Sequence, residues 1–100
     1  NFSARRMLDG EVVLIDFAPE VDHYTSDVTR TFPVNGHFTE AQARIYDTVL
    51  AAQEAGIAVV KPGATLSDVE LACRDVLQAA RMALFRLWDG LDSVLGERPA

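Results

Sequence analysis

The sequence predicts an α+β fold in which an antiparallel β-hairpin, at about residues 11–32, is followed by two helices at about 40–60 and 67–89. Three observations predict this class: an apolar, β-branched run after a turn signal, a second strand-like run rich in threonine, and two later segments with helical periodicity. Strands and helices that occupy separate parts of a chain are typical of α+β domains.

The hairpin is predicted from two strand-like runs and the turn between them. The turn signal Asp9-Gly10 precedes the run EVVLIDF, which is apolar on both alternating faces except at Asp16. The next residues, APEVD, are turn-like because they combine a proline with two acids. The run YTSDVTRTF is again β-branched and aromatic, so the two runs form an antiparallel pair.

Two capping boxes predict where the helices begin. Thr39 with Gln42 opens an alanine-rich segment, and Ser67 with Glu70 repeats the pattern after a break at Pro62-Gly63. The apolar stripe of the first helix consists of Ile45, Val49, Ala52 and Gly56 or Ile57. The second helix keeps a three-four spacing, and we expect it to bend or stop near Asp89-Gly90; its stripe is Leu66, Val69, Cys73, Val76, Ala80, Leu84, Leu87, Leu91 and Val94.

Composition excludes several functional classes. The chain has 100 residues, 49% of them hydrophobic, and a net charge of −6. This charge, without a basic cluster beyond Arg5 and Arg6, argues against nucleic acid and against an anionic membrane as partners. No apolar run reaches the roughly 18 residues of a membrane span, and the first ten residues lack a secretory signal. We therefore expect a cytoplasmic protein.

The single cysteine, Cys73, cannot form an internal disulfide. Its neighbours Leu71, Ala72, Val76 and Leu77 are apolar, which favours a buried, inert thiol over a nucleophile.

Asp16 and Asp27 require a chemical explanation. A hairpin centred between Val21 and Asp22 places these two aspartates directly opposite each other, with Cβ atoms roughly 4.5 to 5.5 Å apart. Two unit charges about 5 Å apart repel by roughly 3 kcal/mol at an effective dielectric near 20. We therefore expect something to neutralise them.

A shared proton, a nearby cation or a metal ion can each neutralise the pair. Arg30 is three positions from Asp27, so strand alternation places its side chain on the opposite face. Hard carboxylate oxygens suit Mn²⁺, Mg²⁺, Co²⁺ or Zn²⁺. The alternatives are a solvated acidic rim of the hairpin and an aspartate that caps a turn.

The stretch DGEVVLIDFAPEVDHYTSDVTRTFPVNGHFTEAQARIYDTVLAAQEAGIAVVKPGATL resembles the metallopeptidase family of aminopeptidase P and Xaa-Pro dipeptidase (prolidase). The resemblance covers Leu8 to Leu66. Its most specific parts are the two aspartates separated by ten residues, the run SDVTRTFPVNG, the segment IYDTVLAAQEAGI and the linker KPGATL. The Arg-Thr-Phe-Pro sequence is similar to this branch rather than to the methionine aminopeptidases.

The resemblance implies a partial pita-bread (creatinase/aminopeptidase-like) fold and a site in which five ligands hold two divalent metal ions. Mn²⁺ is the expected metal, with Co²⁺ or Zn²⁺ as alternatives. Asp16 and Asp27 match the first two ligands, Asp27 touching both ions and Asp16 chelating one. The implied reaction is hydrolysis of the peptide bond before proline. Thr29 shares a face with Asp27, which allows either a hydrogen bond to a ligand or a plain strand-forming role.

The sequence also departs from the family. The family completes its site with a histidine in a Gly-His-Gly segment and two glutamates, and this chain stops before that region. His23 and His37 are interpreted as surface turn residues, and Ala18 stands where the family usually has glycine. We therefore expect residues 1–100 to be a fragment of one metallopeptidase catalytic domain, lacking three of five metal ligands and inactive alone.

Two alternative functions are compatible with the sequence, and one segment has no assigned role. A non-catalytic relative would keep the fold as a peptide-binding or interaction module, although such relatives usually lose the ligands that are present here. A calcium-binding hairpin is disfavoured because oxygen ligands do not recur at alternate loop positions. The segment RMALFRLWDGLDSVLGERPA, residues 81–100, is interpreted as helix packing in a core or as an interface. The expected partners are proline-containing peptides, and a homodimer is a further expectation.

Overall fold

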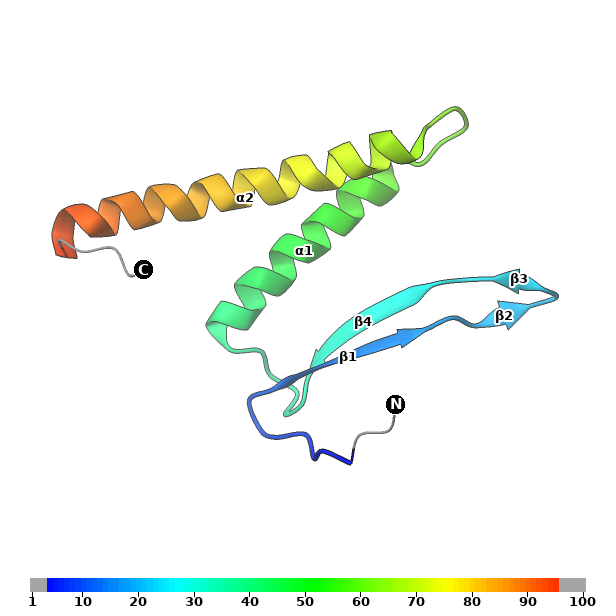
Figure 1. Cartoon of the computed structure of the whole chain (residues 1–100), viewed down its shortest axis with the longest axis horizontal. Coiled ribbons are helices and arrows are strands. Elements are labelled where there is room, and N and C mark those ends of the chain that lie inside the picture. The colour runs from blue at the N-terminus through cyan, green and yellow to red at the C-terminus, as the bar shows by residue number, and fades with distance from the viewer. Residues whose placement is uncertain (1–3, 96–100) are drawn as a thin grey trace. The chain divides into compact units, whose positions relative to one another are not determined.

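The computed structural model describes residues 4–95, and it describes side chains for residues 4–83. The chain forms two compact units, Asn1–Ala43 and Arg44–Ala100. Figure 1 shows the elements in order: β1 (Val12–Phe17), β2 (Glu20–Val21), β3 (Tyr24–Thr25), β4 (Val28–Pro33), α1 (Glu40–Ala58) and α2 (Leu66–Leu95). The predicted α+β class, with a hairpin followed by two helices, is confirmed.

The four strands form one long antiparallel hairpin. β1 pairs with β4, and β2 pairs with β3 nearer the tip (Figure 1). The position numbers of every pair add up to 45. The Val34 N–H donates to the Glu11 carbonyl at 2.9 Å, which extends the same register by one pair beyond β1 and β4. A single register therefore holds from Glu11 to the tip.

The register differs from the predicted one, and the direct opposition of Asp16 and Asp27 is wrong. Asp16 is opposite Thr29. The turn consists of Asp22 and His23, whose φ angles of 51° and 67° lie in the left-handed region. A two-residue hairpin turn of this kind matches the twist of the strands, and Asp and His tolerate positive φ better than most residues. The predicted turn would have required that conformation of the β-branched Val21.

The capping box at the start of α1 is confirmed. The Thr39 N–H donates to Gln42 Oε1 at 2.9 Å, and the Gln42 N–H donates to Thr39 Oγ1 at 3.2 Å. Gln42 Nε2 also donates to the Gly10 carbonyl at 2.9 Å. One side chain therefore caps the helix and ties its first turn to the loop that leads into β1. α1 ends at Ala58, two residues before the predicted end at about residue 60.

The start and the end of α2 both differ from the prediction. The cap is formed by Thr65 and Asp68 rather than by Ser67 and Glu70. The Thr65 N–H donates to Asp68 Oδ2 at 2.7 Å, and the Asp68 N–H donates to Thr65 Oγ1 at 3.2 Å. A carboxylate in the first turn also interacts favourably with the positive end of the helix dipole. The helix continues to Leu95, beyond residues 89–90, because one glycine costs only about 1 kcal/mol inside a helix.

The two helices approach each other through small residues. Ala52 and Gly56 of α1 are the only buried residues among the side chains described, at positions 4–83. A Cβ atom placed on Gly56 would lie 2.5 Å from Cys73 Sγ and 3.4 Å from Val69 Cγ1. Cys73 is therefore half-buried against Gly56, whereas the sequence predicted a buried thiol. The predicted stripe of α1 is buried only in part, since Ile45 and Val49 are exposed.

Apolar side chains stay exposed on both faces of the hairpin. Leu14 is 63% exposed on one face, and Phe17 is 47% exposed on the other. The same holds for Val12, Ile15 and Phe32. Hydrogen bonds and turns, rather than burial in a shared core, therefore define the elements of the hairpin. No helix in the described part of the chain is long and apolar enough to cross a membrane.

The substitution Gln42→Glu should separate the two roles of Gln42. A carboxylate still accepts the Thr39 N–H, but it cannot donate to the Gly10 carbonyl. We expect hydrogen exchange at the Val34 amide to accelerate roughly three- to tenfold, the factor that corresponds to the net free energy of one hydrogen bond. Exchange at the Ala43 amide should stay unchanged. The control Thr39→Ala should accelerate exchange at Ala43, and an unchanged rate at Val34 in Gln42→Glu would contradict the proposed tie.

The substitution Gly56→Ala should destabilise the helix pair. The new Cβ would meet Cys73 Sγ. Overpacking of this kind costs about 1–3 kcal/mol, which outweighs the roughly 1 kcal/mol that alanine gains in helix propensity. Thermal unfolding followed by circular dichroism should show a lower Tm. In a Cys73→Ala background the same change should be neutral or stabilising, and an equal loss in both backgrounds would show that the sulfur is not the obstacle.

Candidate metal centre

Asp16 lies near the end of β1, where its carboxylate is held by the opposite strand. Thr29 Oγ1 donates to Asp16 Oδ1 at 3.1 Å. In an antiparallel pair, hydrogen-bonded and non-hydrogen-bonded residue pairs alternate. Counting from the hydrogen-bonded pair of Glu11 and Val34, Asp16 and Thr29 form a non-hydrogen-bonded pair, in which side chains lie closer together. The register therefore explains why the hydroxyl reaches the carboxylate.

Asp27 comes directly before β4, and the same register places it opposite Ala18. Strand alternation places Asp27 on the same face as Thr29 and Asp16. Asp27 and Asp16 are therefore diagonal neighbours, with Cα atoms roughly 7 Å apart, and they do not face each other directly. Two carboxylates on one face at a diagonal distance can both reach a cation between them.

The diagonal arrangement lowers the repulsion between the two charges. Both aspartates are exposed, so water screens them. Arg30 is paired with Ile15 on the other face of the hairpin, and its Nη1 donates to the Thr29 carbonyl at 2.8 Å. The prediction that Arg30 is poorly placed to neutralise the pair is confirmed. Neutralisation by a cation from outside the hairpin remains compatible with this geometry.

The chemistry of these donors fits a hard divalent cation. Carboxylate oxygens are the ligands that Mg²⁺ and Mn²⁺ prefer, and each carboxylate offers several lone pairs. A carboxylate can therefore accept the Thr29 hydroxyl and still bind a metal. Among the side chains that the structure describes, at positions 4–83, no three His, Cys, Asp or Glu residues come together in an arrangement that could hold a metal ion. Asp16 and Asp27 alone therefore do not form such a group.

The two histidines lie in turns, as predicted, and neither joins the aspartates. His23 occupies the tip of the hairpin, where its Nδ1 lies 3.4 Å from Glu20 Oε1. The backbone N–H of His37 donates to Asn35 Oδ1 at 2.9 Å within the turn that follows β4.

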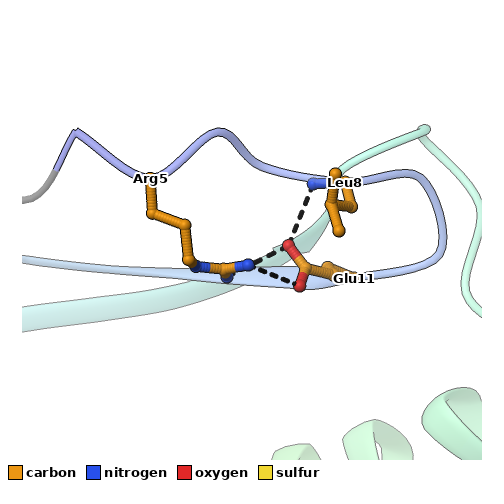
Figure 2. Close-up of polar contacts among 3 residues, drawn as sticks. All are labelled: Arg5, Leu8 and Glu11. Carbon is orange, nitrogen blue, oxygen red and sulfur yellow. Dashed lines mark hydrogen bonds and ion pairs between the residues drawn. The ribbon is translucent and has the colours of Figure 1, made fainter.

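A second polar cluster, which the sequence analysis did not identify, precedes β1. Figure 2 shows the Glu11 carboxylate between Arg5 and the backbone of Leu8. Arg5 donates from Nη1 and Nη2 to the two carboxylate oxygens at 2.8 and 3.1 Å, and the Leu8 N–H donates to Oε2 at 2.9 Å. The hydrogen bonds from Arg5 and from Leu8 lower the pKa of Glu11 below its usual 4.5. The cluster fixes the loop that leads into the hairpin.

The fold is an α+β chain whose hairpin carries two exposed carboxylates, Asp16 and Asp27, on one face. The family model "Metallopeptidase family M24" matches residues 2–96. The chain belongs to this family, and the family implies divalent metal cofactors. The resemblance predicted from the motifs is confirmed.

Relatives and a solved structure support this assignment. The chain is 46% identical over 82 residues to "Xaa-Pro aminopeptidase 1" of Streptomyces coelicolor, and this match covers 81% of the chain and 16% of that protein. It is 49% identical over 63 residues to "Xaa-Pro aminopeptidase" of Escherichia coli, covering 63% of the chain and 14% of that protein.

The structure is similar to "Prolidase from Pyrococcus furiosus", with a TM-score of 0.69 and 36% identity, over 77% of this chain and 23% of that one. The predicted partial pita-bread fold is thereby confirmed. The chain spans less than one quarter of the length of any of these three proteins.

The Glu11 cluster predicts a pH dependence near the start of the hairpin. Because the folded-state pKa is lowered, the stabilisation is present above the usual value of 4.5 and is lost as pH falls through the folded-state pKa. A ¹³C NMR titration of the Glu11 carboxyl should give a pKa below 4.5. In Arg5→Ala the value should move back toward 4.5, because the largest cause of the shift is removed. In the control Arg6→Ala it should stay low, and an equal pKa in both variants would contradict the role of Arg5.

Proposed function

We propose that this chain supplies two metal ligands, Asp16 and Asp27, to the site of an Xaa-Pro peptidase that hydrolyses the peptide bond before proline. The observation that supports the proposal best is the position of both carboxylates on one face of the hairpin, with the Asp16 carboxylate held by Thr29 at 3.1 Å. Membership of the metallopeptidase family M24 and the names of the relatives point to the same reaction.

The proposal gives each residue a distinct task. Asp16 would hold one metal ion, and the Thr29 hydroxyl donates to its carboxylate and orients it, an arrangement that supports ligands in many metal sites. Asp27, which is exposed on the same face, would hold both ions of a two-metal site. When bound, two divalent ions activate a water molecule and stabilise the charge that develops on the peptide oxygen. The further ligands of such a site come from outside the described cluster.

Several finer expectations remain proposals. Mn²⁺ is the proposed metal because the donors identified are hard carboxylate oxygens, and Co²⁺ or Zn²⁺ are alternatives. Proline-containing peptides are the proposed substrates, by analogy with the named relatives. A cytoplasmic location and a homodimer also stay predictions.

A titration of the 100-residue chain with Mn²⁺ tests the ligand assignment. Because two carboxylates are only part of the site, we expect weak binding, measured by the loss of the free Mn²⁺ signal in electron paramagnetic resonance. Asp16→Ala and Asp27→Ala should each weaken this binding at least tenfold. Asp75→Ala removes the same charge from α2 and should leave it unchanged. Equal binding by all four proteins would contradict the assignment, and tight two-metal binding would contradict an incomplete site.

A chimaera tests the reaction itself. The aligned 63-residue segment of the E. coli aminopeptidase can be replaced with the matching segment of this chain. If the two aspartates serve as ligands, the chimaera should hydrolyse Xaa-Pro peptides in the presence of Mn²⁺, and Asp27→Ala in the same background should abolish hydrolysis. A folded, inactive chimaera would argue against the catalytic proposal.

A non-catalytic peptide-binding or interaction module is the second candidate. The two candidates differ in the chimaera, because a module that has lost catalysis would not restore hydrolysis to an otherwise complete site.

A further inference from the structure

The hairpin ladder is interrupted beside Asp27. β1 ends at Phe17 and β2 begins at Glu20, while β3 ends at Thr25 and β4 begins at Val28. The paired position numbers add up to 45 on both sides of this gap. The same register therefore places Ala18 opposite Asp27 and Pro19 opposite Ser26. The residue proposed as the bridging ligand therefore lies in the part of the hairpin with the weakest backbone pairing.

Pro19 removes one of the backbone hydrogen bonds in this gap. Hydrogen-bonded pairs alternate along the hairpin, and counting from Glu11 and Val34 makes Pro19 and Ser26 a hydrogen-bonded pair. Such a pair exchanges two backbone hydrogen bonds, but proline has no N–H to donate. One of the two bonds therefore cannot form at this position.

A side chain bridges the strands at the same pair. Ser26 Oγ donates to the Pro19 carbonyl at 2.7 Å, a short and well-formed hydrogen bond. This bond joins the strands within the gap, one residue from Asp27. It connects positions that the register places opposite each other, so it supports the existing register and not a different one.

We propose that Ser26 is a positioning residue for Asp27. Its hydroxyl donates to the Pro19 carbonyl and so adds a cross-strand hydrogen bond at a pair that lacks the bond a Pro19 N–H would donate, and it thereby holds the backbone of Asp27 opposite Ala18, on the face that carries Asp16. This inference rests on the proposed role of Asp27 as a metal ligand. Thr29 orients Asp16 through its side chain, whereas Ser26 orients Asp27 through the backbone.

The affinity of the 100-residue chain for Mn²⁺ tests this role, with Mn²⁺ alone as the probe. Ser26→Ala should raise the Kd roughly three- to tenfold, the factor that corresponds to the net free energy of one hydrogen bond. Ser26→Thr keeps the hydroxyl and should bind like the unsubstituted chain. Ser67→Ala, the same change at the start of α2, is the matched control and should have no effect. All Kd values are measured at a temperature at which circular dichroism shows every variant fully folded.

A double-mutant cycle with Pro19 makes the test specific. Pro19→Ala restores a backbone N–H, so the ladder can close at this pair without the Ser26 hydroxyl. In that background Ser26→Ala should change the Kd less than twofold. A purely structural role of Ser26 would lower Tm without changing the Mn²⁺ affinity of the folded protein.

The outcomes distinguish this inference from the proposed function. Mn²⁺ binding that is lost in Asp27→Ala but unchanged in Ser26→Ala would overturn the inference alone. An equal loss in Ser26→Ala and Ser26→Thr, or an equal cost of Ser26→Ala with and without Pro19, would overturn it as well. If no binding depends on Asp16 and Asp27, the proposed function fails and the role of Ser26 fails with it.

Discussion

The two-residue turn of Asp22 and His23 is the constraint on which the hairpin depends. Both residues adopt left-handed backbone conformations, and every pair from the tip to Glu11 follows the register that this turn sets. A turn one residue earlier would slide β4 by two positions against β1. Each side chain would stay on its face, because the alternation of a strand has a period of two, but each would meet a different partner. The turn therefore decides that Asp16 meets a hydroxyl instead of a second carboxylate.

That choice of partner matters for the charges on this face. Two carboxylates directly opposite each other would destabilise the hairpin whenever no cation is bound. The diagonal arrangement and the exposure of both groups reduce this cost, while the Thr29 hydroxyl stabilises and orients Asp16. The hairpin can therefore form before a metal binds. A cation would then find one carboxylate already oriented and the second on the same face.

The sequence predicted the class, the order of the elements and the cap formed by Thr39 and Gln42, because these depend on local patterns of apolar, turn and capping residues. It also placed Asp16 and Asp27 on one face, since both candidate registers keep the same alternation.

The register itself was not predicted, because it depends on the small energetic difference between a turn at Val21-Asp22 and a turn at Asp22-His23. The segment TLSDVE contains two overlapping capping boxes, and the pattern alone did not distinguish Thr65 from Ser67. Contacts between side chain and distant backbone, such as Gln42 with Gly10, leave no periodic signal.

The low burial of the chain gives these side-chain hydrogen bonds their importance. Among the described side chains, at positions 4–83, only Ala52 and Gly56 are buried, and both belong to the helical unit. Within the described residues, no side chain of the hairpin is buried. Instead, Glu11 fixes the entry, Gln42 ties that entry to α1, and Ser26 bridges the gap near the tip. Each bond is worth about 1 kcal/mol, which is comparable to the entropy of ordering one residue. Loss of any one of these bonds should therefore loosen the loop that it holds, while the affinity of this face for a cation still depends first on how many ligands are present.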